Sequence, residues 1–161
     1  MKDFVWKTGR KKQTTFSNII KILNDVSIDK DHKIIIGSDS VKTGNLWVFT
    51  KAIAVINPVS GFYDRRYFYL REEIDDLSYI DLSKRLLKET SDSIEIAMRI
   101  QKDISRANLE IHADVNEEVQ HNSARYKNMV SGYITGCGFD VKIKPYSYVA
   151  SSIADNHTRK S

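Results

Sequence analysis

Three segments rich in strand-forming residues follow one another along this chain, and an alternation of helix and strand comes after them. The first segment contains the β-branched run Ile34, Ile35 and Ile36 and stops at Gly37, as a strand buried on both faces would. Short turns separate the second segment (46–56) and the third (62–70) from what precedes them, which favours an antiparallel meander. This order limits the chain to the α/β class of folds.

Helical periodicity marks four further segments. The longest and clearest runs over 82–104, and a leading helix over 16–26 follows Thr14 and Thr15, which are suitable N-caps. Short strands at 109–114 and 139–144 flank a helix over 123–135, and a final helix is expected over 149–158. Because crossover connections are right-handed, the two later strands should lie parallel to the first, which gives a five-stranded mixed sheet.

Composition narrows the class of protein further. With 161 residues, 41% of them hydrophobic, the chain is expected to form a single domain over 1–161. Cys137 is the only cysteine, so an internal disulfide and a cysteine-based zinc site are both excluded. No apolar run is long enough to cross a membrane, so we expect a soluble, cytoplasmic protein without a membrane partner. The net charge of +4 is too small to indicate nucleic-acid binding by itself.

Two strands that should be neighbours each end in an aspartate. Asp39 is at the carboxyl end of the first strand and Asp114 is at the carboxyl end of the fourth. Ligands of open sheets gather at the carboxyl ends of such strands, so we expect the two carboxylates to meet there. Each aspartate alone has a plainer explanation, because Asp commonly ends strands and opens turns. Asp155, in the expected final helix, is either a third member of this group or a solvated helix residue.

Four motifs carry a resemblance to a known family. In this sequence they read IGSDS at 36–40, IHADVN at 111–116, GFDVKIKP at 138–145 and ASSIAD at 150–155. They occur in the expected order over nearly the whole chain. On these motifs the chain resembles the YkuK-like family of predicted ribonuclease H-like proteins. The resemblance implies a ribonuclease H-like fold, with the five strands in the order 3-2-1-4-5, helices flanking the sheet and an extra N-terminal helix.

The resemblance also implies a set of site residues. Members of the ribonuclease H-like superfamily carry metal-binding acids on the first strand, the first long helix, the fourth strand and the last helix. These positions correspond here to Asp39, Glu89, Asp114 and Asp155. Glu95 is a rival to Glu89 as the helix carboxylate, and a solvated helix face explains both equally well. Ser93 and Ala97 follow Glu89 at intervals of four, which indicates that its face packs closely on the sheet.

Carboxylates in such a cluster suit hard divalent cations. Mg²⁺ prefers oxygen ligands, and a pair of ions about 3.5 to 4 Å apart can activate water and stabilise the leaving oxygen in phosphodiester hydrolysis. We therefore expect Mg²⁺ or Mn²⁺ as cofactor, with two ions. His157 could assist product release or proton transfer, as a histidine near the last acid does in some superfamily members, although a surface or capping histidine is the plainer interpretation.

Cations near the expected site could contact a nucleic-acid backbone. They are Lys142 and Lys144 on the last strand, and Arg159 and Lys160 at the end of the chain. Ordinary solubilising surface also explains them.

Two classes of function remain. The first is a metal-dependent nuclease of ribonuclease H-like type acting on RNA, an RNA–DNA hybrid or structured DNA. The second is a catalytically silent module that keeps the fold and binds nucleic acid or a protein; members of that kind usually lose one or more acids. A phosphotransferase on an actin-like fold is disfavoured because the sequence has no glycine-rich phosphate loop.

Overall fold

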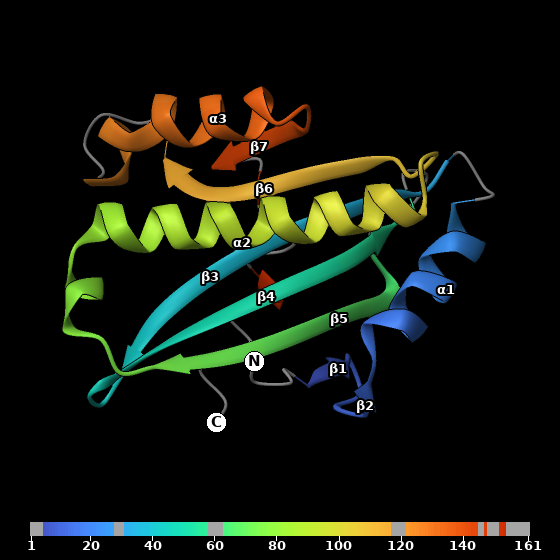
Figure 1. Cartoon of the computed structure of the whole chain (residues 1–161), viewed down its shortest axis with the longest axis horizontal. Coiled ribbons are helices and arrows are strands. Elements are labelled where there is room, and N and C mark those ends of the chain that lie inside the picture. Colours follow the sequence, from blue (N-terminus) through green and yellow to red (C-terminus); the bar gives the residue numbers. More distant parts are fainter. Residues whose placement is uncertain are drawn as a thin grey trace.

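A single mixed sheet organises the chain, with its helices packed mainly on one face (Figure 1). The computed structural model describes residues 5–27, 31–57, 63–116, 122–144, 147 and 152–153. Seven strands form the sheet in the order β2-β1-β5-β4-β3-β6-β7. Their bounds are β1 Trp6–Thr8, β2 Gln13–Thr14, β3 Lys33–Thr43, β4 Leu46–Ile56, β5 Tyr63–Ile74, β6 Leu109–Asn116 and β7 Asp140–Lys144.

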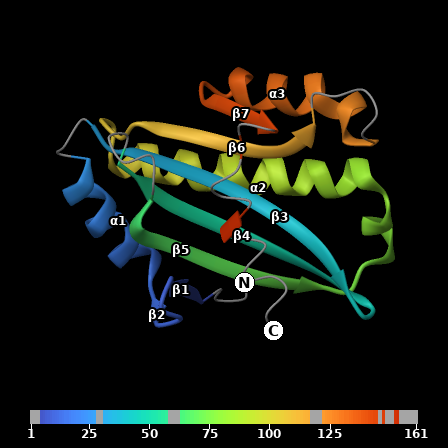
Figure 2. The ribbon, with the colours of Figure 1, turned by 180° about the vertical axis from the view of Figure 1, so that it is seen from behind.

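Three α-helices and two short 3-10 helices complete the described elements. The α-helices are α1 (Phe16–Val26), α2 (Leu82–Asp103) and α3 (Lys127–Gly136), and the 3-10 helices are η1 (Leu77–Ile80) and η2 (Asn122–Tyr126). In Figure 1, α2 lies in front of the sheet, between β6 and β3 in the view; Figure 2 shows the opposite face, where the strands lie in front of α2. Apolar residues from the three α-helices share one core with β3, β4, β5 and β6.

The meander predicted from the sequence is confirmed. β3 pairs antiparallel with β4 from Lys33↔Ile56 to Thr43↔Leu46, and β4 pairs antiparallel with β5. Gly44 begins the two-residue turn between β3 and β4 with φ +62°, a left-handed conformation that costs glycine little. The crossover strands are parallel as expected, β6 to β3 and β7 to β6. The predicted order 3-2-1-4-5 therefore survives as β5-β4-β3-β6-β7.

The predicted number of strands is wrong, because the sheet has seven strands rather than five. β1 and β2 extend the edge next to β5, through the pairs Lys7↔Tyr69 and Trp6↔Thr14. Strands of three and two residues are too short to show an alternating pattern in the sequence. In the structure Trp6 is buried, and its ring centroid lies 6.0 Å from that of Phe16.

Several boundaries also differ from the prediction. β3 and β5 are longer than expected, because both keep pairing with β4 over its whole length. The helix expected over 123–135 begins as η2 and becomes α-helical at Lys127. After it, Gly138 adopts φ +89°, and its N–H donates to Thr135 O at 3.0 Å, a C-terminal closure that favours glycine. Of the final helix expected over 149–158, only Ser152 and Ile153 belong to the described residues, and both are helical.

Candidate active site

Asp39 and Asp114 lie where two parallel strands separate. The pairing of β3 with β6 runs from Ile34↔Leu109 to Gly37↔His112 and goes no further, although both strands continue. Asp39 and Asp114 are each two residues beyond that last pair. The two aspartates are therefore inside their strands rather than at their ends, which corrects the expectation that strand ends would deliver them. What brings the two aspartates together is the point where β3 and β6 stop pairing, rather than the ends of the strands.

An irregularity in β6 accompanies this separation. β6 and β7 pair at His112↔Lys142 and again at Asn116↔Lys144, so the three β6 residues 113–115 oppose the single β7 residue 143. Such a bulge bends the strand and redirects its side chains. Asp114 lies within the bulged stretch.

Glu89 approaches this gap from α2. Its side chain is 8% exposed, and its Oε1 accepts a hydrogen bond of 2.5 Å from the Ser40 hydroxyl on β3. Burial raises the pKa of Glu89 well above its usual value, and the neighbouring carboxylates Asp39 and Asp114 raise it further, against the lowering effect of the Ser40 hydrogen bond. Carboxyl groups from β3, α2 and β6 thus lie close enough to repel one another.

Placement distinguishes Glu89 from its rival. Glu95 is exposed and borders a different groove, together with Arg99 and the start of α1. Ser93 and Ala97 are buried on the same face of α2 as Glu89, as their spacing predicted. Of the two glutamates, Glu89 is the one beside the aspartates.

Ser40 contributes to this site in a way that the sequence did not indicate. The backbone N–H of Ser40 donates to Asp39 Oδ1 at 2.9 Å. Its hydroxyl, however, goes to Glu89. Ser40 therefore links the two acids, and only the position of α2 over β3 decides this.

A lysine contacts one of the three acids of the site. Lys144 Nζ lies 2.5 Å from Asp114 Oδ1. Burial alone would lower the pKa of Lys144, but attraction to Asp114, and then to Asp39 and Glu89, outweighs it, so the pKa is raised. Lys144 was expected to contact nucleic acid, which stays a prediction; in the structure it contacts an acid of the site. Lys142, two residues earlier, is exposed on β7.

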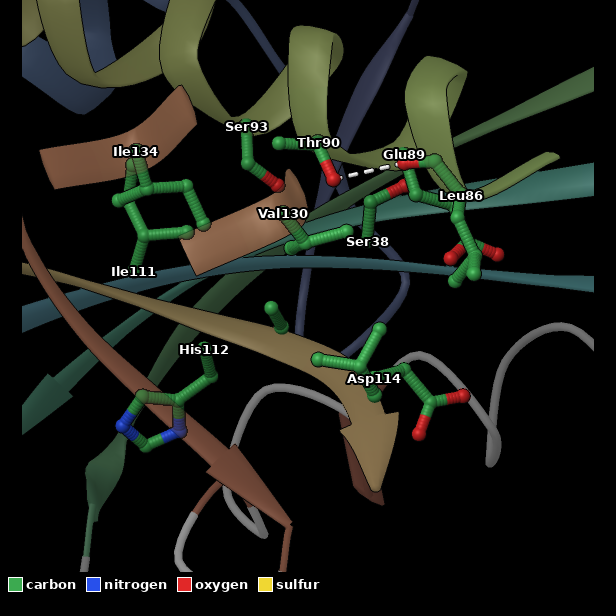
Figure 3. Close-up of a pocket in the computed structure, with 12 residues that line it drawn as sticks. Ser38, Leu86, Glu89, Thr90, Ser93, Ile111, His112, Asp114, Val130 and Ile134 are labelled. Atoms are coloured by element: carbon green, nitrogen blue, oxygen red, sulfur yellow. Dashed lines mark hydrogen bonds between the residues drawn. The ribbon is translucent and has the colours of Figure 1, made fainter. Parts of the chain in front are cut away.

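A small pocket adjoins the acids under α2 (Figure 3). Its volume is about 10 Å³, room for roughly one water molecule, and Ser38, Glu89, Ser93 and Asp114 line its polar part. The Ser38 hydroxyl is buried without a hydrogen-bond partner among the described residues. Figure 3 also shows His112 projecting from β6 away from α2, where its Nε2 lies 2.9 Å from Glu110 Oε1.

The remaining predicted site residues, Asp155, His157, Arg159 and Lys160, lie outside the described residues. Ile153 is described, and it packs against Ala52 and Ala54 of β4, which are separate from the core under the helices. The roles predicted for all four residues stay predictions.

The donor chemistry of the described acids fits a hard divalent cation. Asp39, Glu89 and Asp114 offer only oxygen, the ligand that Mg²⁺ prefers, and a cation between them would offset the repulsion that raises the pKa of Glu89. Within the described ranges, no group of three or more His, Cys, Asp or Glu side chains is already arranged to hold a metal ion. The acids are close, but cation binding would require them to rearrange, including the Asp114 contact with Lys144.

A much larger groove, of about 970 Å³, lies between the start of α1 and the other side of α2. Two lysines on its floor, Lys51 and Lys88, each pair with both Glu72 and Asp92, at 3.0 to 3.7 Å. Because the two lysines and the two acids neutralise one another, these four side chains together carry no excess positive charge that would attract a polyanion.

Comparison with known proteins gives one match. The model of a family described as Ribonuclease H-like matches residues 14–159. No curated protein and no solved structure gives a significant match. In the part of the chain that the structure describes, no helix combines the length and the apolar character that a membrane span needs.

Proposed function

The chain belongs to the ribonuclease H-like family, and on this premise we propose that it is a metal-dependent nuclease that hydrolyses phosphodiester bonds. RNA, an RNA–DNA hybrid or structured DNA would be its substrate. The observation that carries the proposal is the approach of Asp39, Glu89 and Asp114 from three elements to the point where β3 and β6 separate. Such a cluster stabilises a fold poorly, because like charges repel, and it suits a site for cations.

Each part of the chain has a distinct task in this proposal. Asp39, Glu89 and Asp114, with Asp155 by resemblance, would hold Mg²⁺ or Mn²⁺. Two bound ions would supply an activated water and stabilise the leaving oxygen. Ser40 holds the Glu89 carboxyl toward β3 through its hydroxyl, which limits the positions that this carboxyl can take. Lys142, Arg159 and Lys160 would contact phosphates, and His157 would assist proton transfer or product release.

Lys144 favours a second candidate function. Its ammonium group already pairs with Asp114, and this pairing would suit a module that binds nucleic acid or a protein without catalysis. Such a module would need no cation at the acids.

Cleavage assays with labelled RNA, DNA and hybrid duplexes test the proposal. We expect cleavage in Mg²⁺ or Mn²⁺, none in EDTA, and a loss of at least about 100-fold in Asp39→Asn and Asp114→Asn. Asp103→Asn is the matched control, because Asp103 is exposed at the end of α2 and the substitution makes the same change of charge. If the protein binds nucleic acid but cleaves it with neither Mg²⁺ nor Mn²⁺, the silent module is favoured. Cleavage that survives in Asp39→Asn would contradict the proposed site.

A further inference from the structure

Lys144 makes the closest contact between opposite charges at the candidate site. It is the last residue of β7, and it pairs with Asn116 just past the bulge of β6 that contains Asp114. Its Nζ is 2.5 Å from Asp114 Oδ1, with the lysine side chain 45% exposed and the aspartate side chain 24% exposed. An ordinary surface pair would involve two exposed groups, whereas here an exposed lysine reaches a partly buried acid.

The other acids of the site reinforce this contact. Asp39 and Glu89 both attract the Lys144 ammonium group, in addition to Asp114. The single positive charge of Lys144 therefore offsets part of the repulsion within the whole cluster. A divalent cation at the same acids would have the same effect with twice the charge.

We propose that Lys144 is a tethered counter-ion of the acidic site, which a divalent cation must displace from Asp114 in order to bind. The inference rests on the proposed function, because it concerns the cations that the nuclease would use.

Displacement follows from the size and charge of the two cations. Mg²⁺ binds carboxylate oxygens at about 2.0 to 2.1 Å, so an ammonium group in contact with the same carboxylate would repel it. The long, flexible stem of lysine and the exposure of Lys144 allow the ammonium group to swing away. Once released, it lies beside the metal site, where a phosphate of the nucleic acid offers a new partner. Lys144 would then pass from an acid of the protein to the substrate as the metal binds.

Metal affinity measured by calorimetry, without substrate, tests the inference directly. Lys144→Met removes the charge and keeps most of the length of the side chain. We expect it to bind Mn²⁺ and Mg²⁺ roughly tenfold more tightly than the unmodified protein, because no ammonium group has to be displaced. In EDTA, the same variant should melt at a lower temperature and gain more from added metal, since its acids have lost their counter-ion.

Lys142→Met provides the matched control. It makes the same change of charge on the same strand, and among the described residues Asp114 pairs with Lys144 rather than with Lys142. Its metal affinity should stay within about twofold of the unmodified protein if only the direct contact matters. Circular dichroism of each variant establishes that it folds.

Two results would overturn the inference, and they differ in what they mean for the proposed function. Equal or weaker metal affinity in Lys144→Met would show that Lys144 does not compete with the cation, and would leave the nuclease proposal standing. Absence of metal binding in both the unmodified protein and the variant would overturn the inference and the metal-dependent function together.

Discussion

Glu110 lies on the side of β6 that faces away from the core under the helices. Its Oε1 is 2.9 Å from His112 Nε2, and Lys33 Nζ donates to its Oε2 at 3.1 Å. The hydrogen bond from His112, followed by the hydrogen bond and charge of Lys33, lowers the pKa of Glu110 from 4.5 to about 2, against the opposing effect of burial. His112 is buried, and this contact with Glu110 links two residues of the same strand.

Acid should weaken this part of the protein within a defined range of pH. Because the folded pKa is below the unfolded one, ionised Glu110 stabilises the fold above pH 4.5, and this contribution is lost as the pH falls from about 4.5 toward about 2. Glu110→Gln should therefore be less stable than the unmodified protein at pH 6, and the difference should shrink at pH 3. Urea unfolding at both values measures it. Glu95→Gln, on an exposed face of α2, should show no comparable change, and a difference for Glu110→Gln that stays constant with pH would contradict the assignment.

At the scale of single elements, α1 begins as its sequence indicated. Thr15 has an extended backbone, and its Oγ1 accepts a hydrogen bond of 3.1 Å from the N–H of Asn18. This bond satisfies one of the free N–H groups in the first turn. The helix then buries Ile19, Leu23 and Val26 against the sheet.

Loss of this cap should destabilise the protein measurably. Thr15→Ala removes the accepting oxygen, and we expect it to lower the free energy of unfolding by about 1 kcal/mol. Thr15→Ser keeps an accepting hydroxyl and should lower it by less than half as much. Chemical denaturation of both variants gives the comparison, and equal losses would mean that the methyl group of Thr15, rather than its hydroxyl, stabilises the helix.

At the scale of the whole molecule, a network of charges attaches α2 to the sheet. Lys88 and Asp92 of α2 interact with Lys51 of β4 and Glu72 of β5. Burial raises the pKa of Asp92 even though both lysines lower it. The four side chains are only 12 to 18% exposed, so solvent screens their charges poorly and they depend on one another.

Removal of one cation from this network should therefore cost more than loss of a surface pair. Lys88→Met leaves Glu72 and Asp92 with one fewer cation, and we expect the free energy of unfolding to fall by about 2 kcal/mol. Lys84→Met, on the same helix, breaks an exposed pair with Asp76, which precedes η1, and should lower the free energy of unfolding far less. Thermal or urea unfolding of the two variants measures both losses of stability. Equal losses would mean that solvent screens the network as strongly as it screens the surface pair.

Local pattern alone determined a large part of this protein. The β-branched run at 34–36 indicated a buried strand, the period of 82–104 indicated the long helix, and crossover rules indicated which strands are parallel. Spacing along α2 also placed Glu89 on the same face as Ser93 and Ala97. These features depend on residues close in sequence or on general rules of chain topology, so they can be read without coordinates.

Contacts between distant segments were decided only by the tertiary structure. The edge strands β1 and β2 exist because β5 offers them a partner, and the gap that receives Glu89 exists because β3 and β6 stop pairing after Gly37. Ser40 binds Glu89, and Lys144 binds Asp114, because α2 and β7 are docked where they are. The sequence carries the residue types needed for each contact, but the energy of a long-range pair depends on distance and burial, and both arise only when the whole chain has folded.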